Sequence, residues 1–250
     1  MDRRGRPRAL IFDLYNTLID IRTEEGSAEV WRALARLLRY WGLPADDEAL
    51  RPAFEAAARA TRRPGERHPE VDLVAAFDAV LAGLGYRGPA PLGAEVAGLF
   101  RALSMRRFAP FPDAAPALAR LRPAVALGLV SDAQRVFLEP ELRLAGLDHF
   151  FPVRIVSGDY GFRKPDPRLF AMALAALGVA PGEAAYVGDH PYHDICGARA
   201  AGLTAILLAR PGRAVEDARA CAPDLTVAGL DELADWALGR PRPSSRAHPS

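Results

Sequence analysis

Several polar residues of this chain come at the ends of short apolar runs, and their side chains have the chemistry needed to process an anion. They are Asp13, Ser131, Lys164, Asp189 and Asp194. An aspartate carboxylate can attack an electrophile or bind a metal ion, a serine hydroxyl can donate a hydrogen bond, and a lysine ammonium can balance an anionic substrate. A second interpretation stays open for Asp13, because aspartate is also common at helix N-caps and in turns.

The apolar runs themselves predict strands that are buried on both faces of a parallel sheet. Residues 9–12 lead to Asp13, and residues 125–130 lead to Ser131. Similar runs cover 153–157, 184–187 and 204–208, with a weak one at 225–227. Because helical patterns separate these runs, the sequence predicts an α/β fold with a doubly wound parallel sheet. Parallel strands end at one edge of a sheet, so we expect the polar residues to meet there.

Three of the converging residues are carboxylates, and a cluster of three negative charges requires a cation. Asp13, Asp189 and Asp194 offer only oxygen ligands, a donor set that favours Mg2+. Lys164 adds positive charge for an anionic substrate, and Ser131 adds a hydroxyl donor. The sequence therefore predicts a magnesium site beside an anion site.

Residues 21–108 interrupt the α/β pattern. Apolar residues recur at helical spacing over 27–42, and further helices are expected at 46–61, 70–84 and 93–107. We therefore predict an all-helical domain at 21–108, inserted into a core made of residues 1–20 and 109–238. The tail, residues 239–250, is rich in Pro, Ser and Arg and is expected to be disordered.

Composition narrows the choice of partners. The 250 residues are 50% hydrophobic and 25% charged, with a formal net charge of +1, which favours a small-molecule substrate over nucleic acid or a membrane surface. No apolar run reaches the roughly 18 residues of a membrane helix. Cys196 and Cys221 form no C-x-x-C pair, so we expect reduced thiols in a cytoplasmic protein. We expect the protein to be a monomer or a homodimer.

The order of these motifs resembles that of the haloacid dehalogenase superfamily of hydrolases. Its first motif, Asp-x-Asp-x-Thr, corresponds to Asp13-Leu14-Tyr15-Asn16-Thr17, and its second corresponds to Ser131. The third and fourth correspond to Lys164-Pro165-Asp166-Pro167 and to the segment from Gly188-Asp189 to Asp194. The helical insert resembles the cap domain of that family.

The resemblance implies a role for each matching residue. Asp13 would attack the substrate and form a covalent intermediate, while Ser131 and Lys164 would hold the substrate oxygens. The implied catalytic set is Asp13, Tyr15, Ser131 and Lys164. The implied substrate-binding set is Asn16, Thr17, Ser131, Asp132 and Lys164, with Thr17 also steadying the loop. The implied Mg2+ ligands are Asp13, the main-chain carbonyl of Tyr15, Asp189 and Asp194.

Tyr15 departs from the family's phosphatases, which have a second aspartate there as the acid and base. Tyrosine at this position is similar to the 2-haloacid dehalogenases, whose halide leaves without a proton. Asp189 and Asp132, in contrast, are unlike the dehalogenase motifs, and an extra carboxylate without a cation would be repelled. The favoured reading is a Mg2+-dependent phosphatase of small phosphorylated metabolites. A 2-haloacid dehalogenase and a catalytically weak phospholigand-binding relative are the alternatives.

Two interpretations stay open for each of three further polar residues near these motifs. His190 and His193 could bind a transition metal or touch substrate, although exposed loop histidines are the more common case. Asp132 could assist proton transfer near Ser131, and a helix cap is the favoured alternative.

Overall fold

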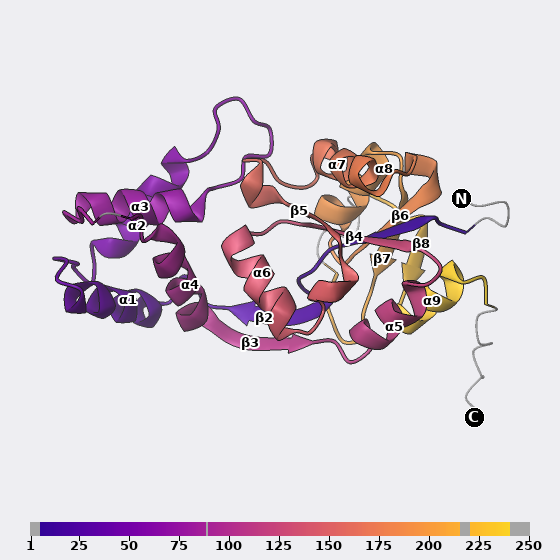
Figure 1. The fold of residues 1–250 in the computed structure, drawn as a ribbon, viewed down its shortest axis with the longest axis horizontal. Helices are drawn as coiled ribbons and strands as arrows, with labels where there is room; N and C mark the ends of the chain where they lie inside the picture. The colour runs from indigo at the N-terminus through magenta and orange to yellow at the C-terminus, as the bar shows by residue number, and fades with distance from the viewer. Residues whose placement is uncertain (1–5, 89, 216–220, 241–250) are drawn as a thin grey trace.

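A computed structural model describes residues 6–88, 90–215 and 221–240. It divides the chain into a core that contains a sheet and a helical insert that projects from one side of that core (Figure 1). The outermost residues at both ends, including positions 241–250 of the predicted tail, lie outside the described residues. Within the described residues no helix is both long enough and apolar enough to span a membrane.

The core is built on a parallel sheet of six strands in the order β5-β4-β1-β6-β7-β8. The strands are β1 (Ala9–Phe12), β4 (Ala126–Ser131), β5 (Val153–Val156), β6 (Ala184–Gly188), β7 (Thr204–Leu208) and β8 (Leu225–Val227). The central strand β1 is entirely buried, as its unbroken apolar run predicts. The predicted doubly wound α/β fold is confirmed, including the weak strand at 225–227.

Helices cover both faces of the sheet. On one face lie α5 (Ala114–Leu121), α6 (Arg135–Leu144) and α9 (Leu230–Ala237), and on the other lie α7 (Pro167–Leu177) and α8 (Gly197–Ala200). Side chains of β1 alternate between the two layers, with Leu10 and Phe12 in the first and Ala9 and Ile11 in the second. Short helical turns complete the core: η1 (Asp148–Phe150), η2 (Ser157–Asp159), η3 (Pro181–Glu183) and η4 (Pro191–Cys196).

The described part of the insert contains four helices: α1 (Ala28–Tyr40), α2 (Leu50–Ala60), α3 (Leu73–Gly83) and α4 (Gly93–Ser104). They enclose an apolar cluster of their own, in which the rings of Phe54 and Phe77 lie 4.4 Å apart and those of Trp31 and Phe100 lie 4.9 Å apart. Phe137 of α6 joins this cluster and so packs the insert against the core. The four predicted helices are confirmed.

Both ends of the insert form strands that the sequence reading missed. The strands β2 (Ile19–Thr23) and β3 (Met105–Pro110) pair antiparallel as a two-stranded ribbon, and Figure 1 shows this ribbon linking the insert to the core. The expectation that 21–108 is all-helical is therefore wrong at its two ends. Arg106 and Arg107 interrupt the apolar pattern directly after α4, so the sequence there gave no strand signal.

A second connection comes from residues 61–72, which join α2 to α3 and which we call the docking loop. It arches from the insert towards the core (Figure 1) and pairs with residues 161–163. The amide of Arg163 donates to the carbonyl of His68 (2.9 Å), and the amide of Glu70 donates to the carbonyl of Gly161 (3.0 Å). The insert is thus bonded to the core on two sides.

Cys196 and Cys221 form a disulfide, with their Cα atoms 5.4 Å apart. The prediction of reduced thiols is therefore wrong, and the cytoplasmic assignment loses the support it drew from them. Cys196 ends η4 and Cys221 precedes β8, so their proximity depends on the strand order of the sheet. The two cysteines are 25 residues apart and match no recognised spacing motif, so the disulfide could not be predicted from their positions in the sequence.

Candidate active site

Asp13 and Lys164 meet at the carboxyl end of the sheet. Asp13 follows β1, and its amide donates to the carbonyl of Val187 in β6 (2.9 Å). The ammonium of Lys164, which precedes α7, donates to Oδ1 of Asp13 (2.8 Å) and to Oδ1 of Asp194 (2.6 Å). All three side chains are buried. The expected convergence of Asp13, Lys164 and Asp194 is therefore present.

Asp189 completes a group of three carboxylates. One oxygen from each of Asp13, Asp189 and Asp194 can be chosen so that all lie within 4.8 Å of one another. Oδ1 of Asp189 accepts a hydrogen bond from the hydroxyl of Thr17 (3.0 Å), and Oδ2 of Asp194 accepts one from the amide of His190 (2.9 Å). Thr17 thus steadies a carboxylate as well as its own loop.

The charges of this group do not balance without a further cation. Three carboxylates face the single ammonium of Lys164. Burial raises the pKa of the Asp13 carboxyl to about 8, although Lys164 acts in the opposite direction. Burial, and next the charge of Asp194, raises the pKa of Asp189 to about 6. An all-oxygen donor set with excess negative charge fits a divalent ion such as Mg2+.

Ser131 ends β4 at the same edge, and its hydroxyl is fully buried. Among the described residues, this hydroxyl has no hydrogen-bond partner. Buried hydroxyls in folded proteins are nearly always paired, so an orphaned one at a strand end indicates a position for a ligand oxygen. The placement agrees with the anion-holding role that the sequence suggested.

Tyr186 is a residue of this site that the sequence reading missed. Its hydroxyl accepts a hydrogen bond from the Lys164 ammonium (3.0 Å) and lies 3.0 Å from both the Val130 carbonyl and Oδ1 of Asp194, either of which can take its proton. Burial raises the pKa of this phenol well above its usual value, so it stays protonated. The signal in the sequence that could have pointed to Tyr186 was a phenol within the otherwise apolar run of β6.

Asp132 does not cap the helix that follows it. The first turn of α6 has no side-chain cap, and Oδ1 of Asp132 instead accepts the amide of Lys164 (2.9 Å). The favoured cap interpretation is therefore wrong, because the N-cap position of α6 is Gln134 and the Asp132 carboxylate bonds to the turn that carries Lys164. Burial raises the pKa of Asp132 to about 6. Its position fixes the backbone from which Lys164 extends.

The side chain of Tyr15, two residues after Asp13, forms its hydrogen bond with α6 and not with the loop that follows β1. Its hydroxyl donates to Oε2 of Glu141 on α6 (2.5 Å). Arg101 of α4 donates to both oxygens of Glu141 (2.7 and 3.3 Å) and lies 5.3 Å from the centre of the Tyr15 ring. Burial, and next the Glu141 carboxylate, raise the pKa of Tyr15 well above its usual value. Sequence reasoning missed Glu141 and Arg101.

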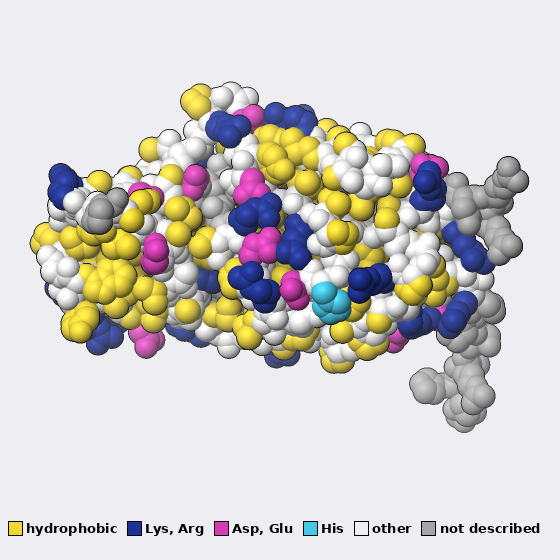
Figure 2. Space-filling model, viewed as in Figure 1, with side chains coloured by type: hydrophobic (Ala, Val, Ile, Leu, Met, Phe, Trp, Pro, Cys, Tyr) yellow, Lys and Arg dark blue, Asp and Glu magenta, His cyan; other side chains and the backbone are white. Residues whose placement is uncertain are grey.

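Glu141 is buried, unlike the outward-facing residues of the same helix. Figure 2 shows charged side chains of both signs gathered over α6 on the surface. That surface includes ion pairs of Arg135 with Glu139 (2.8 Å) and of Arg154 with Glu139 (2.5 Å). Glu141, two residues after Glu139 and so on the opposite side of the helix, has only 4% of its surface exposed. A buried glutamate requires partners, and here they are Tyr15 and Arg101.

His190 and His193 are half-buried, with His190 bonded to its own loop and His193 to the turn that carries Lys164. Nδ1 of His190 accepts the amides of Tyr192 (3.2 Å) and His193 (3.3 Å), and Nδ1 of His193 lies 2.9 Å from the carbonyl of Lys164. The group of potential metal ligands found among the described residues contains aspartates only. The histidines therefore shape the loop that carries Asp189 and Asp194.

A cavity of about 400 Å³ lies between the insert and the core beside these residues. Its lining comes from both parts: Tyr15, Asn16, Ile21, Thr23, Glu25, Glu70, Val71, Leu73, Arg101, Asp132, Ala133, Gln134, Phe137 and Arg163. Gln134 links the two parts through its amide group, which donates to the Val71 carbonyl (2.8 Å) and accepts from the Leu73 amide (3.1 Å). Tyr15, Asn16 and Asp132 bring the cavity next to the two strand ends that carry Asp13 and Ser131.

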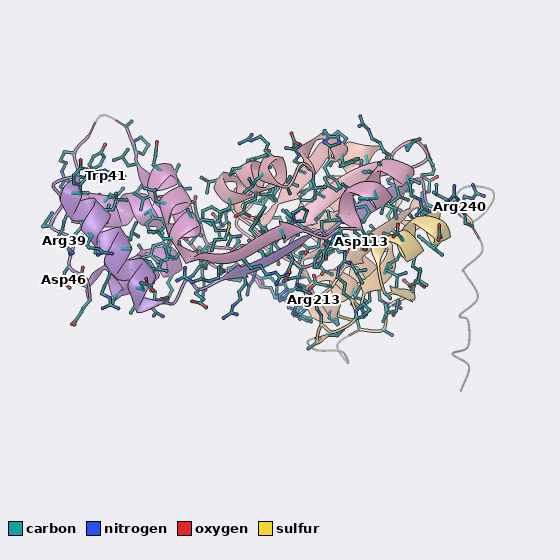
Figure 3. All side chains as sticks on the ribbon, turned by 90° about the horizontal axis from the view of Figure 1, so that it is seen from below. Arg39, Trp41, Asp46, Asp113, Arg213 and Arg240 are labelled. Carbon is teal, nitrogen blue, oxygen red and sulfur yellow. A yellow bond between two sulfur atoms is a disulfide. The ribbon has the colours of Figure 1, made fainter. Side chains whose placement is uncertain are left out.

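Asn16 lies between this cavity and a second one, of about 300 Å³, that reaches Asp189. Its backbone adopts φ 61°, a left-handed conformation that asparagine tolerates better than most residues. Its Oδ1 accepts a hydrogen bond from Arg213 (3.2 Å). Figure 3 shows Arg213 and Asp113 on the core, whereas Arg39 and Trp41 lie on the insert at its end away from the core.

Comparison with known proteins agrees with this geometry. The family model of haloacid dehalogenase-like hydrolases matches residues 7–202. A phosphoserine phosphatase of Thermus thermophilus is 46% identical over 129 residues, about half (51%) of each chain. A glyceraldehyde 3-phosphate phosphatase of Methanopyrus kandleri is 29% identical over 94% of both chains.

A solved structure shares the architecture as well. The 2-haloacid dehalogenase from Pseudomonas syringae pv. Tomato is 27% identical, with a TM-score of 0.67 over 93% of this chain and 98% of the other. Phosphatases and dehalogenases are thus both similar to this protein. Since the family model covers most of the chain and the motif residues meet at one sheet edge, this protein belongs to the haloacid dehalogenase-like hydrolases.

Proposed function

We propose that this protein is a Mg2+-dependent phosphatase of small phosphorylated metabolites, with Asp13 as the nucleophile. The observation that carries the proposal is the position of Asp189, which adds a third carboxylate to Asp13 and Asp194 within 4.8 Å. A hydrolase that works without metal gains nothing from this additional buried charge. The phosphatase names of the relatives in Thermus and Methanopyrus point the same way.

The residues of the site suggest a two-step reaction. An oxygen of Asp13 attacks phosphorus, an aspartyl phosphate forms, and the ester P–O bond breaks. Water then attacks the phosphoryl group, which releases inorganic phosphate and regenerates the carboxylate. The hydroxyl of Ser131 binds a phosphoryl oxygen. Lys164 supplies positive charge to the phosphoryl group, exchanging one of its three hydrogen bonds for a phosphoryl oxygen, and holds Asp13 in place (2.8 Å).

The carboxylates of Asp13, Asp189 and Asp194 and the main-chain carbonyl of Tyr15 are the groups that would hold Mg2+. When bound, the ion supplies positive charge to the phosphoryl oxygens. Lys164 occupies Oδ1 of both Asp13 and Asp194, and Thr17 occupies Oδ1 of Asp189. The second oxygens of Asp13 and Asp189 are thus the natural ligand atoms.

The leaving group receives little help in this scheme. The Tyr15 hydroxyl already donates to Glu141 (2.5 Å), so the departing alkoxide takes its proton from water. Substrates whose leaving groups need little protonation should therefore react fastest.

We further propose that the insert serves as a cap that covers the site, with the predicted division at 21–108 and 109–238. The cavity between the insert and the core, and the pairing of the docking loop with residues 161–163, support this role. Closure of this kind excludes water while a covalent intermediate forms.

A 2-haloacid dehalogenase is the second candidate, favoured by Tyr15 and by the similarity to the Pseudomonas syringae enzyme. In that reaction Asp13 would displace a halide from carbon, with no proton needed by the leaving group. A weak phospholigand-binding protein is the third candidate, favoured by the absence of a carboxylate at position 15.

The test is a hydrolysis panel of phosphomonoesters and 2-chloro acids, each assayed with Mg2+ and with a chelator. Phosphate release that the chelator abolishes supports the proposal, and metal-independent halide release overturns it in favour of the dehalogenase. Binding of phosphate esters without turnover would indicate the third candidate. Asp13→Asn, which keeps the shape but not the anion, should lower turnover about 10³-fold or more while the circular dichroism spectrum is unchanged.

A further inference from the structure

Two guanidinium groups line the cavity between insert and core, and they differ in how they are bonded. Arg101 is held by two protein carboxylates, since three of its five N–H groups donate to the two oxygens of Glu141 and to Glu25 (3.2 Å). Arg163 also lines the cavity and is exposed. Within the part of the chain that the structure describes, its side chain has no hydrogen bond or ion pair. Arg163 is therefore the guanidinium whose paired donors on one edge are all open to a ligand, whereas Arg101 is held in place by Glu141 and Glu25.

The backbone around Arg163 is held in place. Its amide donates to the carbonyl of His68 (2.9 Å), and its carbonyl accepts the amide of Asp166 (3.1 Å). Side chains alternate along this extended segment. Phe162 and Lys164, on either side, are buried, and Lys164 reaches Asp13. Arg163 accordingly points away from the buried lysine and into the cavity.

Arg163 and Lys164 are consecutive residues, with the Arg163 side chain in the wall of the cavity and the Lys164 ammonium buried at Asp13. Lys164 serves the reacting end of the substrate, and Arg163 can serve the other end. A guanidinium offers a planar pair of N–H donors that matches a carboxylate in two parallel hydrogen bonds. A second phosphate is a poorer fit, because Glu25, Glu70 and Asp132 line the same cavity and would repel a dianion more strongly.

We propose that Arg163 binds a carboxylate carried by the substrate at the end away from its phosphate. The substrate class would then be small phosphorylated hydroxy acids and amino acids, of a size that a cavity of about 400 Å³ admits. This inference rests on the proposed phosphatase function and goes further by assigning a specificity-determining residue outside the four motif positions.

The test compares 3-phosphoglycerate with glyceraldehyde 3-phosphate, which differ only in a carboxylate in place of an aldehyde. The wild type should prefer the acid in kcat/KM. Arg163→Gln should reduce that preference about 10- to 100-fold, as expected for the loss of charge-assisted hydrogen bonds. Arg163→Lys, which keeps the charge but not the planar pair of donors, should restore part of the preference.

Arg67→Gln is the matched control, because Arg67 is an exposed arginine of the docking loop that does not line the cavity. It should leave the preference unchanged. The inference is overturned if Arg163→Gln lowers kcat/KM equally for both substrates, or if it leaves their ratio as in the wild type.

A separate measurement distinguishes failure of this inference from failure of the proposed function. Hydrolysis of p-nitrophenyl phosphate, which has no carboxylate, reports on metal-dependent phosphatase chemistry alone. If that activity is absent, titration calorimetry of 3-phosphoglycerate with the wild type and with Arg163→Gln still tests the binding role. Equal affinities of the two proteins would overturn it.

Discussion

The phenol of Tyr15 donates a 2.5 Å hydrogen bond to Oε2 of Glu141, so the side chain two residues after Asp13 is tied to α6. An aspartic acid at position 15 could, in its protonated form, protonate a leaving alkoxide, and the carboxylate that results could then activate water. Tyr15→Asp should therefore raise kcat/KM for an alkyl phosphate, by up to about 10²-fold. The gain should be smaller for an aryl phosphate, whose leaving group needs little protonation.

Tyr15→Phe is the control, since it removes the hydroxyl and keeps the ring beside Arg101. It should not reproduce the gain. A Tyr15→Asp variant that folds and binds Mg2+ but gains nothing on alkyl phosphates would contradict the phosphatase reading of this position. If the protein instead released halide from 2-chloro acids, the added negative charge beside Asp13 should slow that release.

Asp189 should determine metal affinity and, through it, thermal stability. A ligand at 100 times its Kd adds about 2.7 kcal/mol to the free energy of unfolding. For a chain of this size that raises Tm by about 5–10 °C. The Mg2+-dependent rise should vanish in Asp189→Asn and persist in Asp47→Asn, a surface control whose ion pair with Arg39 lies on the insert. A scanning calorimeter measures both. An undiminished rise in Asp189→Asn would exclude Asp189 as a ligand.

The disulfide between Cys196 and Cys221 should contribute measurably to stability. Closing a loop of 25 residues stabilises the folded state by about 3 kcal/mol in the chain-entropy description. Reduction should therefore lower Tm by about 6–12 °C. A Cys196→Ser, Cys221→Ser double variant should match the reduced protein and be insensitive to reductant. Titration of two free thiols in the unreduced, denatured protein would show that the bond is absent.

Asp113 should make stability depend on acid pH. Burial acts to raise the pKa of this carboxyl, but hydrogen bonds from Arg210 (3.0 Å) and from the amide of Leu230 (2.8 Å) outweigh it, so the pKa is lowered. A lowered pKa in the folded state stabilises the protein above the ordinary aspartate value near pH 4 and ceases to do so as pH falls.

Asp113→Asn should accordingly cost about 1 kcal/mol at neutral pH, less than a fully buried charged pair because solvent screens it. The difference from the wild type should shrink as pH falls below about 4. Urea unfolding at several pH values gives both curves. A difference that stays constant down to pH 3 would contradict the assignment.

The sequence predicted those features that depend on local pattern. Unbroken apolar runs specify β1 and β4, and strand ends at one edge specify the meeting of Asp13 with Lys164. Residues whose importance comes from tertiary contact could not be found in this way. Glu141 is one charged residue on an amphipathic helix until α4 brings Arg101 against it. The pairing of β2 with β3 was equally invisible, because its partners are separated by the whole insert.

The two connections between insert and core differ in how easily they can separate. The β2–β3 ribbon is continuous with the chain at both ends of the insert. The docking loop is instead held by separate hydrogen bonds and one ion pair. Backbone bonds at His68 and Glu70 contribute about 0.5–1.5 kcal/mol each. Side-chain bonds join Glu70 to Ser157 (2.7 Å), Val71 to Gln134 (2.8 Å) and Glu66 to Arg168 (2.5 Å). We therefore expect that, if the insert moves as the proposed cap, the docking loop separates from the core while the ribbon stays paired. Because the amide of Arg163 bonds to the docking loop, separation of this loop from the core would also release the residue that we propose binds the substrate carboxylate.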